Sequence, residues 1–444
     1  MENNKVLTSY FDGVQVKSKH LKIVLLIAMG LLFDMMDNYN FSFVAPTLMK
    51  NWGITLEQVG KINSLFFLGM LVGSMIGGFI SDHIGRKKAF LASSIFFSVF
   101  SIANGLAPNV NVFMAMRFLT GIGIASLIIV AVPYMVEMLP AESRGKWQAL
   151  GIGFGYFGIP FIAVICKKII PLAPENWRFI YMIGGGGFII FILGLLWLEE
   201  SPRWLVAKGR IAEAEKVVEK MTGCKADLSG VVRNTEKASV SYVLREMFSK
   251  KLIRNSLVLL EIFWLAYAAG FIFISFAPTL LVTKGFSVAD GLTLSMMMSF
   301  GFVAGPFVAS AISDKGGRKV PIVALNVIML ILSIIYALLT NKIAIITIAV
   351  LMSVFVQAMC AVTQTYLGEL FPTNIRNAAS GIIYSTGRIP TAIAMVVIPV
   401  INKTYGYVGV FVVMGVIYVI TAVTVGVWGV RASGKSLEAI EEAA

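Results

Sequence analysis

The run from Leu21 to Pro46 constrains this chain more than any other stretch. As a helix with a rise of about 1.5 Å per residue, it is long enough to cross the ~30 Å hydrocarbon core of a bilayer. Yet it carries two carboxylates, Asp34 and Asp37, which lie on one helix face because they are three residues apart. A carboxylate that faces lipid costs several kcal/mol, so both must face protein or a water-filled cavity. This pattern is typical of a transport path.

Further apolar runs indicate a polytopic membrane protein. Of the 444 residues, 57% are hydrophobic and only 14% are charged, and soluble globular proteins do not have this composition. The net charge of +13 does not indicate nucleic-acid binding, because the basic residues lie in short segments between the runs. The three cysteines show no metal-ligand spacing, so we expect no metal. Nothing in the sequence resembles a catalytic or nucleotide-binding constellation, so we expect no cofactor and no enzyme activity. The twelve predicted spans are residues 21–46, 58–81, 89–107, 111–137, 146–170, 178–198, 254–282, 290–313, 320–340, 343–368, 377–401 and 407–430.

The distribution of lysine and arginine predicts the orientation of the chain. Cytoplasmic connections carry an excess of these residues, and here the excess falls on both termini and on alternate connections. We therefore expect a multi-pass protein of the cell membrane, with both termini cytoplasmic, that functions as a monomer in the lipid bilayer. The basic residues of this set are Lys17, Lys19, Lys22, Arg86, Lys87, Lys88, Arg144, Lys146, Lys315, Arg318, Lys319, Arg376, Arg431 and Lys435.

The two halves of the chain repeat each other at one fixed shift, since Arg86 recurs as Arg318, 232 residues later. A single register without gaps predicts two six-helix repeats of the same orientation, which is one architecture of secondary transporters. Asp34 and Asp37 have no counterparts, because alanines stand at the shifted positions; this favours a function for them over a scaffold role. Further matched pairs are Asp82 and Asp314, Tyr134 and Tyr366, Glu137 and Glu369, and Arg144 and Arg376.

The predicted organisation is a six-helix bundle at residues 1–198, a cytoplasmic linker at 199–253, a second bundle at 254–430 and a cytoplasmic tail at 431–444. Apolar residues between Leu205 and Met221 recur at helical spacing among charges. We interpret them as an amphipathic helix on the membrane surface, and residues 243–248 as a second one.

The connection from Gly78 to Lys88 has the pattern G-x-x-x-D-x-x-G-R-K-x and resembles the signature of the major facilitator superfamily. The resemblance covers the whole chain and implies the twelve-helix fold of that superfamily. An acid–base set beside a turn glycine can latch two helix ends at the cytoplasmic face, whereas plain positive-inside charge would not explain why the aspartate recurs. The expected gate residues are Gly78, Asp82, Gly85, Arg86, Glu137, Arg144, Asp314, Arg318, Glu369 and Arg376.

Arg117 opens the pattern R-x-x-x-G-x-G in the fourth span. This pattern is similar to one of the same superfamily, in which the arginine is associated with proton coupling. A buried guanidinium needs an anion, and Asp34 and Asp37 lie at similar depth. Ionising both aspartates in a low-dielectric site is unfavourable, so the pair can take up a proton near neutral pH. We expect these three residues to form a coupling site; a purely structural ion pair is the alternative.

Two further segments resemble particular branches of the superfamily. Residues 199–205, E-E-S-P-R-W-L, are similar to the segment after the sixth span in the sugar-and-other-metabolite branch. The D-x-x-D spacing of the first span resembles aromatic acid:proton and related metabolite:proton symporters, which have D-G-x-D where this chain has Met35. The seventh span lacks the glutamine pair of hexose porters, so the site is poorly equipped for sugar hydroxyls.

Arg388 lies near the middle of the eleventh span and is a candidate anchor for an anionic substrate, because guanidinium pairs bidentately with carboxylate. The alternative is a structural pair with Asp34 or Asp37. Glu261, in the seventh span, is interpreted as part of a gating or structural pair. Four aromatic residues are candidates for the lining of a substrate pocket, with simple packing as the alternative. They are Tyr156, Trp264, Tyr267 and Tyr384.

The sequence favours a proton-driven symporter of a small organic acid, whose partners are its substrate and protons. One alternative is a proton-coupled or facilitative transporter of a sugar or other neutral metabolite. A non-transporting receptor is disfavoured, because the long connection is too short and polar for an output domain. No loop of the pattern G-x-x-x-x-G-K-[ST] occurs, so the energy does not come from ATP.

Overall fold

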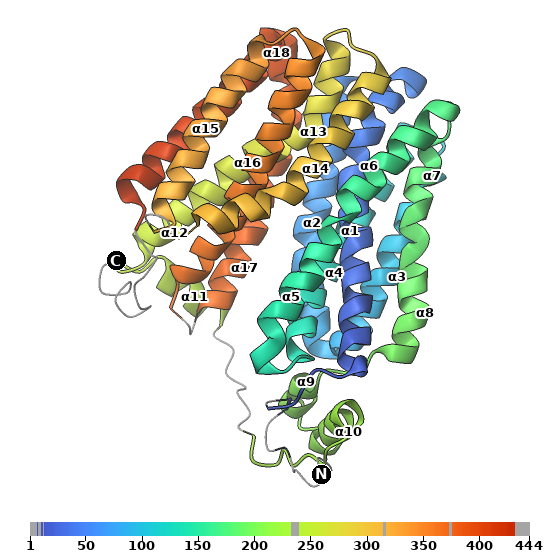
Figure 1. The fold of residues 1–444 in the computed structure, drawn as a ribbon, viewed down its shortest axis with the longest axis vertical. Helices are drawn as coiled ribbons and strands as arrows, with labels where there is room; N and C mark the ends of the chain where they lie inside the picture. Colours follow the sequence, from blue (N-terminus) through green and yellow to red (C-terminus); the bar gives the residue numbers. More distant parts are fainter. Residues whose placement is uncertain are drawn as a thin grey trace. The chain divides into compact units, whose positions relative to one another are not determined.

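The computed structural model describes residues 7, 10–11, 13–231, 239–313, 317–372 and 375–430, which form helices joined by short connections (Figure 1). This confirms the predicted all-α membrane fold. The helices before the linker are α1 (Ser18–Trp52), α2 (Leu56–Ile84), α3 (Arg86–Gly105), α4 (Val110–Glu137), α5 (Ala141–Tyr156), α6 (Gly158–Ile169), α7 (Trp177–Met182) and α8 (Gly187–Trp197). The linker holds α9 (Pro202–Ala207), α10 (Ile211–Thr222) and α11 (Val240–Met247). The helices after it are α12 (Ile253–Glu261), the π-helix η3 (Ile262–Ala266), α13 (Tyr267–Thr283), α14 (Val288–Ile312), α15 (Lys319–Leu338), α16 (Lys342–Glu369), α17 (Arg376–Thr386) and α18 (Arg388–Trp428).

Within the described residues, ten helical segments are long and apolar enough to cross a membrane. α1, which has 35 residues, is not among them. The last of the ten, Arg376–Trp428, contains a break at Gly406, whose φ of 67° and ψ of −174° are not helical. Adding α1 and dividing that segment at Gly406 gives the twelve spans that the sequence predicts.

The connections that alternate with the basic ones are very short. They comprise residues 53–55, 106–109, 173–176 (after the 3-10 turn Ile170–Leu172), 284–287 and 339–341, and the single residue Gly406. Gly406 can turn the chain on its own because glycine adopts positive φ without steric cost.

By its contacts the chain divides into two units. The first comprises Met1–Asn38, Gly69–Ile162 and Arg178–Lys237, and in it α3 packs against α4 and α8 (Figure 1). α2 approaches α4 through a stripe of glycines four residues apart. A Cβ added at Gly69, Gly73 or Gly77 would lie 2.1, 2.2 or 2.6 Å from backbone atoms of α4. Small residues at this spacing let helix backbones approach closely, so the stripe fixes the α2–α4 contact.

The second unit comprises Tyr39–Leu68, Ala163–Trp177 and Ala238–Ala444. Its α14 packs against α16, and a Cβ added at Gly301 or Gly305 would lie 2.0 or 2.5 Å from side-chain atoms of α16. These two glycines follow Gly69 and Gly73 by 232 residues, so the repeat extends to the packing of the helices.

Parts of α1 and α2 that belong to the second unit contact the later helices directly. The rings of Tyr39 and Phe302 lie 5.6 Å apart, and those of Phe67 and Phe271 lie 5.0 Å apart. A Cβ added at Gly60 would lie 2.3 Å from the backbone oxygen of Met395. Since several of these contacts involve backbone atoms or bulky rings, these parts of α1 and α2 are tightly packed against the later helices of the second unit.

The linker corrects one prediction. Residues 205–221 form two helices, α9 and α10, because the chain turns at Gly209, whose φ is 78°. Their apolar face is covered by protein and not by the membrane surface. Ala214 and Val218 are fully buried in a hydrophobic core that also contains Leu7 and Phe11. The sequence pattern was that of an amphipathic helix, but it did not reveal which surface covers the apolar face.

The N-terminal segment fastens this linker to the start of α1. Leu7 exchanges backbone hydrogen bonds with Lys225 and Asp227. The ring of Phe11 meets the ring of His20 edge-on at 5.3 Å, and His20 is completely buried. Nδ1 of His20 accepts a hydrogen bond from the backbone N–H of Lys17 at 3.1 Å. His20 therefore joins the N-terminal segment to the first turn of α1.

Burial lowers the pKa of His20 to about 4 from its ordinary 6.5. The folded protein thus holds the neutral ring, whereas the unfolded chain takes up a proton at the ordinary pKa. Stability contributed by this site is present above pH 6.5 and is lost as the pH falls towards 4. His20→Asn keeps an acceptor for the Lys17 N–H but does not titrate, so its thermal midpoint should fall less between pH 7 and pH 5. The exposed His83→Asn variant should keep the wild-type slope; an unchanged slope in His20→Asn would contradict the assignment.

Candidate functional site

The first unit contains a buried ion pair between Asp37 of α1 and Arg117 of α4. Arg117 Nη1 lies 3.0 Å from Asp37 Oδ2, and the two side chains are 1% and 2% exposed. The other carboxylate oxygen, Oδ1, accepts a hydrogen bond of 2.6 Å from Ser101 Oγ on α3. Because both carboxylate oxygens of Asp37 have donors, the charged form is compensated inside the bundle.

Asp34 lies one turn before Asp37 on α1 and is completely buried. The guanidinium of Arg117 lies 5.8 Å from the ring centroid of Tyr181 on α7, and Ser101 Oγ is also 3.0 Å from the backbone oxygen of Tyr181. α1, α3, α4 and α7 therefore converge on one buried polar site that contains an ion pair. The structure brings Asp37 and Arg117 together as the sequence predicted, and identifies Ser101 and Tyr181, which sequence reasoning missed.

In the second unit, Arg388 lies at the junction of α17 and α18 and is 8% exposed. Its guanidinium lies 4.9 Å from the ring centroid of Tyr384. Phe263 links this pair to a third aromatic ring: its centroid is 6.1 Å from that of Tyr384 and 4.4 Å from that of Tyr267, with which it stacks. Arg388, Tyr384 and Tyr267 are thus joined through Phe263. Asp37, offered above as a structural partner of Arg388, pairs with Arg117.

A π-helix positions this aromatic cluster. Residues Ile262–Ala266 form η3, which interrupts the seventh span between α12 and α13. π-Helices are rare, appear mostly as single turns inside α-helices and are frequent at functional sites. η3 carries Phe263 and also Trp264, whose Nε1 donates to Thr386 Oγ1 at 3.3 Å. Directly before it, Glu261 accepts a hydrogen bond of 2.8 Å from Thr421 on α18. No charged partner of Glu261 occurs among the described residues. The partner observed for the predicted gating or structural pair is therefore the hydroxyl of Thr421.

The acid–base set at the end of α2 forms one network. Arg86 Nη1 lies 2.8 Å from Asp82 Oδ1, and Arg86 Nε lies 3.2 Å from Glu137 Oε2 at the end of α4. Glu200 caps the start of α3: its Oε1 accepts hydrogen bonds from the backbone N–H groups of Arg86 at 2.7 Å and Lys87 at 3.1 Å. A carboxylate at a helix N-terminus is stabilised by the helix dipole. The pKa of Glu200 is nevertheless raised overall, because burial of its carboxyl group outweighs the opposite effect of these backbone hydrogen bonds.

Gly85 makes this cap possible, because its φ is 101° and a Cβ would lie 2.2 Å from Glu200 Oε2. In the second unit Arg318 repeats the arrangement, with Nη2 2.8 Å from Glu369 Oε1. Both arginines also donate to a serine, Ser81 or Ser313, at 2.9 and 2.8 Å. The duplicated sequence therefore builds a duplicated contact.

Other predicted gate residues differ from this pattern. A Cβ at Gly78 would meet only Ile129 Cγ2 at 3.8 Å, so Gly78 is not the residue of close packing; its neighbour Gly77 is. No salt bridge of Arg144 occurs in the described part of the chain. Arg376 donates to the backbone oxygen of Phe371 at 3.0 Å. Asp314 lies outside the described residues, and Tyr156, at the end of α5, belongs to a different unit from the aromatic cluster.

Comparison with known proteins supplies independent information. The family model described as "Sugar (and other) transporter" matches residues 27–444. The inner membrane metabolite transport protein YdjE of Escherichia coli is 27% identical over 454 aligned residues that cover 100% of both chains. The niacin transporter NiaP of Acinetobacter baylyi is 28% identical over 444, covering 98% of this chain and 99% of NiaP.

A solved structure shares the fold. The partially occluded, inward-open form of the xylose transporter XylE from E. coli superposes with a TM-score of 0.76 at 18% identity, covering 95% of this chain and 100% of XylE. At this identity the likeness establishes the architecture alone.

Proposed function

Because this chain belongs to the sugar (and other) transporter family of the major facilitator superfamily, it is a membrane transporter of small metabolites, and we propose that it carries a small organic acid together with protons. The observation that carries this proposal is the pairing of Asp37 with Arg117 inside the first unit. A fully buried carboxylate that is paired with a cation is a group whose protonation changes the net charge of the bundle.

Alternating access needs only a difference in state preference between the loaded and the empty carrier. A proton on the Asp34–Asp37 pair and an anion at Arg388 together leave the net charge of the carrier unchanged. The empty, deprotonated carrier must close without the substrate anion at Arg388 and with an ionised carboxylate at the Asp34–Asp37 pair, which costs more. Coupling follows if closure is easier with both ligands bound than with either one.

The aromatic cluster supports an organic acid as substrate. Arg388 offers a planar, permanently charged group that matches a carboxylate. The half-buried ring of Tyr384 lies beside it, and Phe263 meets that ring edge-on while stacking on Tyr267. Stacking on such rings favours a planar substrate. The relative NiaP is named for niacin, which is a planar carboxylic acid, and this agrees with the proposed class.

The test is a thermal-shift screen of the purified protein against aromatic and aliphatic organic acids, sugars and amino acids. A ligand at 100 times its Kd should stabilise the folded protein by about 2.7 kcal/mol. Hits are then assayed for uptake into proteoliposomes with and without an inward proton gradient. Stabilisation by organic acids and gradient-dependent accumulation support the proposal. Stabilisation by sugars alone, or uptake indifferent to the gradient, would reject the substrate class or the coupling.

The Arg86 network should act as a latch that breaks as the carrier opens to the cytoplasm. Asp82→Asn keeps the size of the side chain but removes one of the two charges that hold Arg86. We expect it to slow turnover and shift site accessibility, with substrate affinity within a few-fold of wild type. Asp227→Asn, an exposed aspartate of the linker, is the matched control. Wild-type turnover in Asp82→Asn would remove the latch role.

A further inference from the structure

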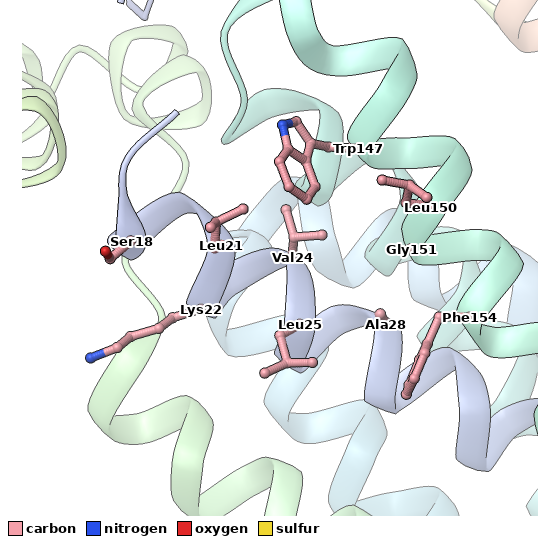
Figure 2. A pocket seen from close by; sticks show the side chains of 10 residues that line it. All are labelled: Ser18, Leu21, Lys22, Val24, Leu25, Ala28, Trp147, Leu150, Gly151 and Phe154. Carbon is pink, nitrogen blue, oxygen red and sulfur yellow. The ribbon is translucent and has the colours of Figure 1, made fainter. Parts of the chain in front are cut away.

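An apolar groove of about 420 Å³ lies between the first turns of α1 and the middle of α5, within the first unit (Figure 2). Val24, Ala28 and Gly151 are among the residues that line it, and the side chains of Trp147 and Phe154 stand along the α5 side. Leu25 and Leu150 are 48% and 53% exposed, so the described residues leave the groove uncovered.

The groove runs along the start of the first span. It follows α1 from Ser18 to Ala28, and the part from Lys22 to Ala28 rises about 9 Å along the helix. This part fits within one half of the ~30 Å hydrocarbon core. Its long direction is that of α1, and a lipid chain beside a spanning helix runs the same way.

One end of the groove is cationic and carries tryptophans. Lys22 lines the groove, and its Nζ lies 5.6 Å from the ring centroid of Trp197 on α8. Lys146 Nζ lies 5.8 Å from the ring centroid of Trp147. No carboxylate of the described residues forms a salt bridge with either lysine.

Two more lysines, Lys17 and Lys19, begin the same helix, and their Nζ atoms donate to backbone oxygens of the linker. Tryptophan is enriched at the membrane–water interface, and basic pockets between spanning helices on the cytoplasmic side bind anionic headgroups. The cationic end thus coincides with the level at which headgroups lie.

We propose that this groove binds an anionic diacyl phospholipid of the leaflet at the basic side of the protein. One acyl chain lies along Leu21, Leu25 and Phe154, and the phosphate is held by Lys22. The charge at one end and the apolar lining that follows it into one leaflet together match this ligand. A soluble anion would use only the lysines, and a neutral lipid would use only the apolar lining.

The experiment measures contact between Trp147 and lipid. The protein is reconstituted in phosphatidylcholine vesicles that contain an equal mole fraction of phosphatidylglycerol or phosphatidylcholine with brominated acyl chains, which quench tryptophan fluorescence. Subtracting the signal of Trp147→Phe isolates Trp147. Brominated phosphatidylglycerol should quench this component at least about threefold more than brominated phosphatidylcholine, because Lys22 enriches the anionic lipid. Lys22→Ala should bring the ratio to one, and Lys88→Ala, an exposed lysine at the start of α3, should leave it unchanged.

Native mass spectrometry provides a second readout that does not require Trp147→Phe to fold. Wild type and Lys88→Ala should retain one phosphatidylglycerol under conditions that strip phosphatidylethanolamine, and Lys22→Ala should lose it. Equal quenching by both brominated lipids would mean ordinary bilayer contact and would overturn the proposal. So would an unquenched Trp147, which would mean that protein covers the groove.

Discussion

Asp37→Asn should abolish accumulation driven by a pH gradient while leaving counterflow exchange nearly intact. The substitution keeps the shape of the side chain and its hydrogen bond from Ser101 but removes the proton-binding group. Since exchange does not require net proton movement, only the driven mode should fail. We expect accumulation on the gradient to fall at least about tenfold, because a neutral amide offers no titrating group near Arg117. Uptake and counterflow in the same proteoliposomes measure both modes.

The variant also leaves Arg117 buried without its anion, which typically costs about 3–5 kcal/mol. The double variant Asp37→Asn/Arg117→Gln should therefore recover thermal stability without recovering coupling, which separates loss of folding from loss of function. Glu57→Gln, which removes an exposed carboxylate paired with Lys403 at 3.4 Å, is the control and should transport normally. If Asp37→Asn and Asp34→Asn both still concentrate substrate on the gradient, the proton is carried elsewhere.

Arg388→Ala should abolish binding of the acid. Truncating one partner of a buried, hydrogen-bonded charge pair costs about 2–5 kcal/mol, so affinity should fall by roughly 30-fold to several thousand-fold. Arg388→Lys keeps the charge but loses the planar guanidinium group. Its affinity for the acid should lie between that of wild type and that of Arg388→Ala. The measurement is ligand-induced stabilisation in the thermal-shift assay.

Lys342→Ala is the matched control for this prediction, because Lys342 is a half-exposed cation paired with Asp290. Its affinity for the acid should be that of wild type. Unchanged affinity in Arg388→Ala would mean that the guanidinium serves only to pack on Tyr384. In that case the anion is held by another group, and the organic-acid proposal loses its anchor.

Most of the fold was predictable because two signals in the sequence are strong. Apolar runs long enough to span a bilayer mark the helices, and their observed bounds differ from the predicted ones by a few residues. The fixed shift that maps Arg86 onto Arg318 predicted duplicated contacts, and both arginines indeed bind the glutamate at the matching position, Glu137 or Glu369. The positions of the charged residues and the register of the repeat can be read directly from the sequence, because each depends only on which residue stands at which position.

The details that could not be predicted depend on direction and on partners. Gly77 and Gly78 are adjacent, and only the observed rotation of α2 shows that Gly77 faces α4. Glu199 and Glu200 are likewise adjacent, yet Glu200 caps α3 while Glu199 pairs with Lys220. The π-helix that brings Phe263 to Tyr384 leaves no mark in hydrophobic periodicity, because the five residues that form it, Ile262–Ala266, are all apolar.

The short connections have a consequence for how this protein closes. Active-site lids and binding loops of other proteins are segments long enough to fold over a ligand. Between α13 and α14 only residues 284–287 are available, and between the eleventh and twelfth spans only Gly406 is. Neither can reach across an opening. At this end, therefore, closure requires the helices themselves to tilt or bend as rigid elements. Substitutions that stiffen helix ends should accordingly affect transport more than changes in the turns that join them.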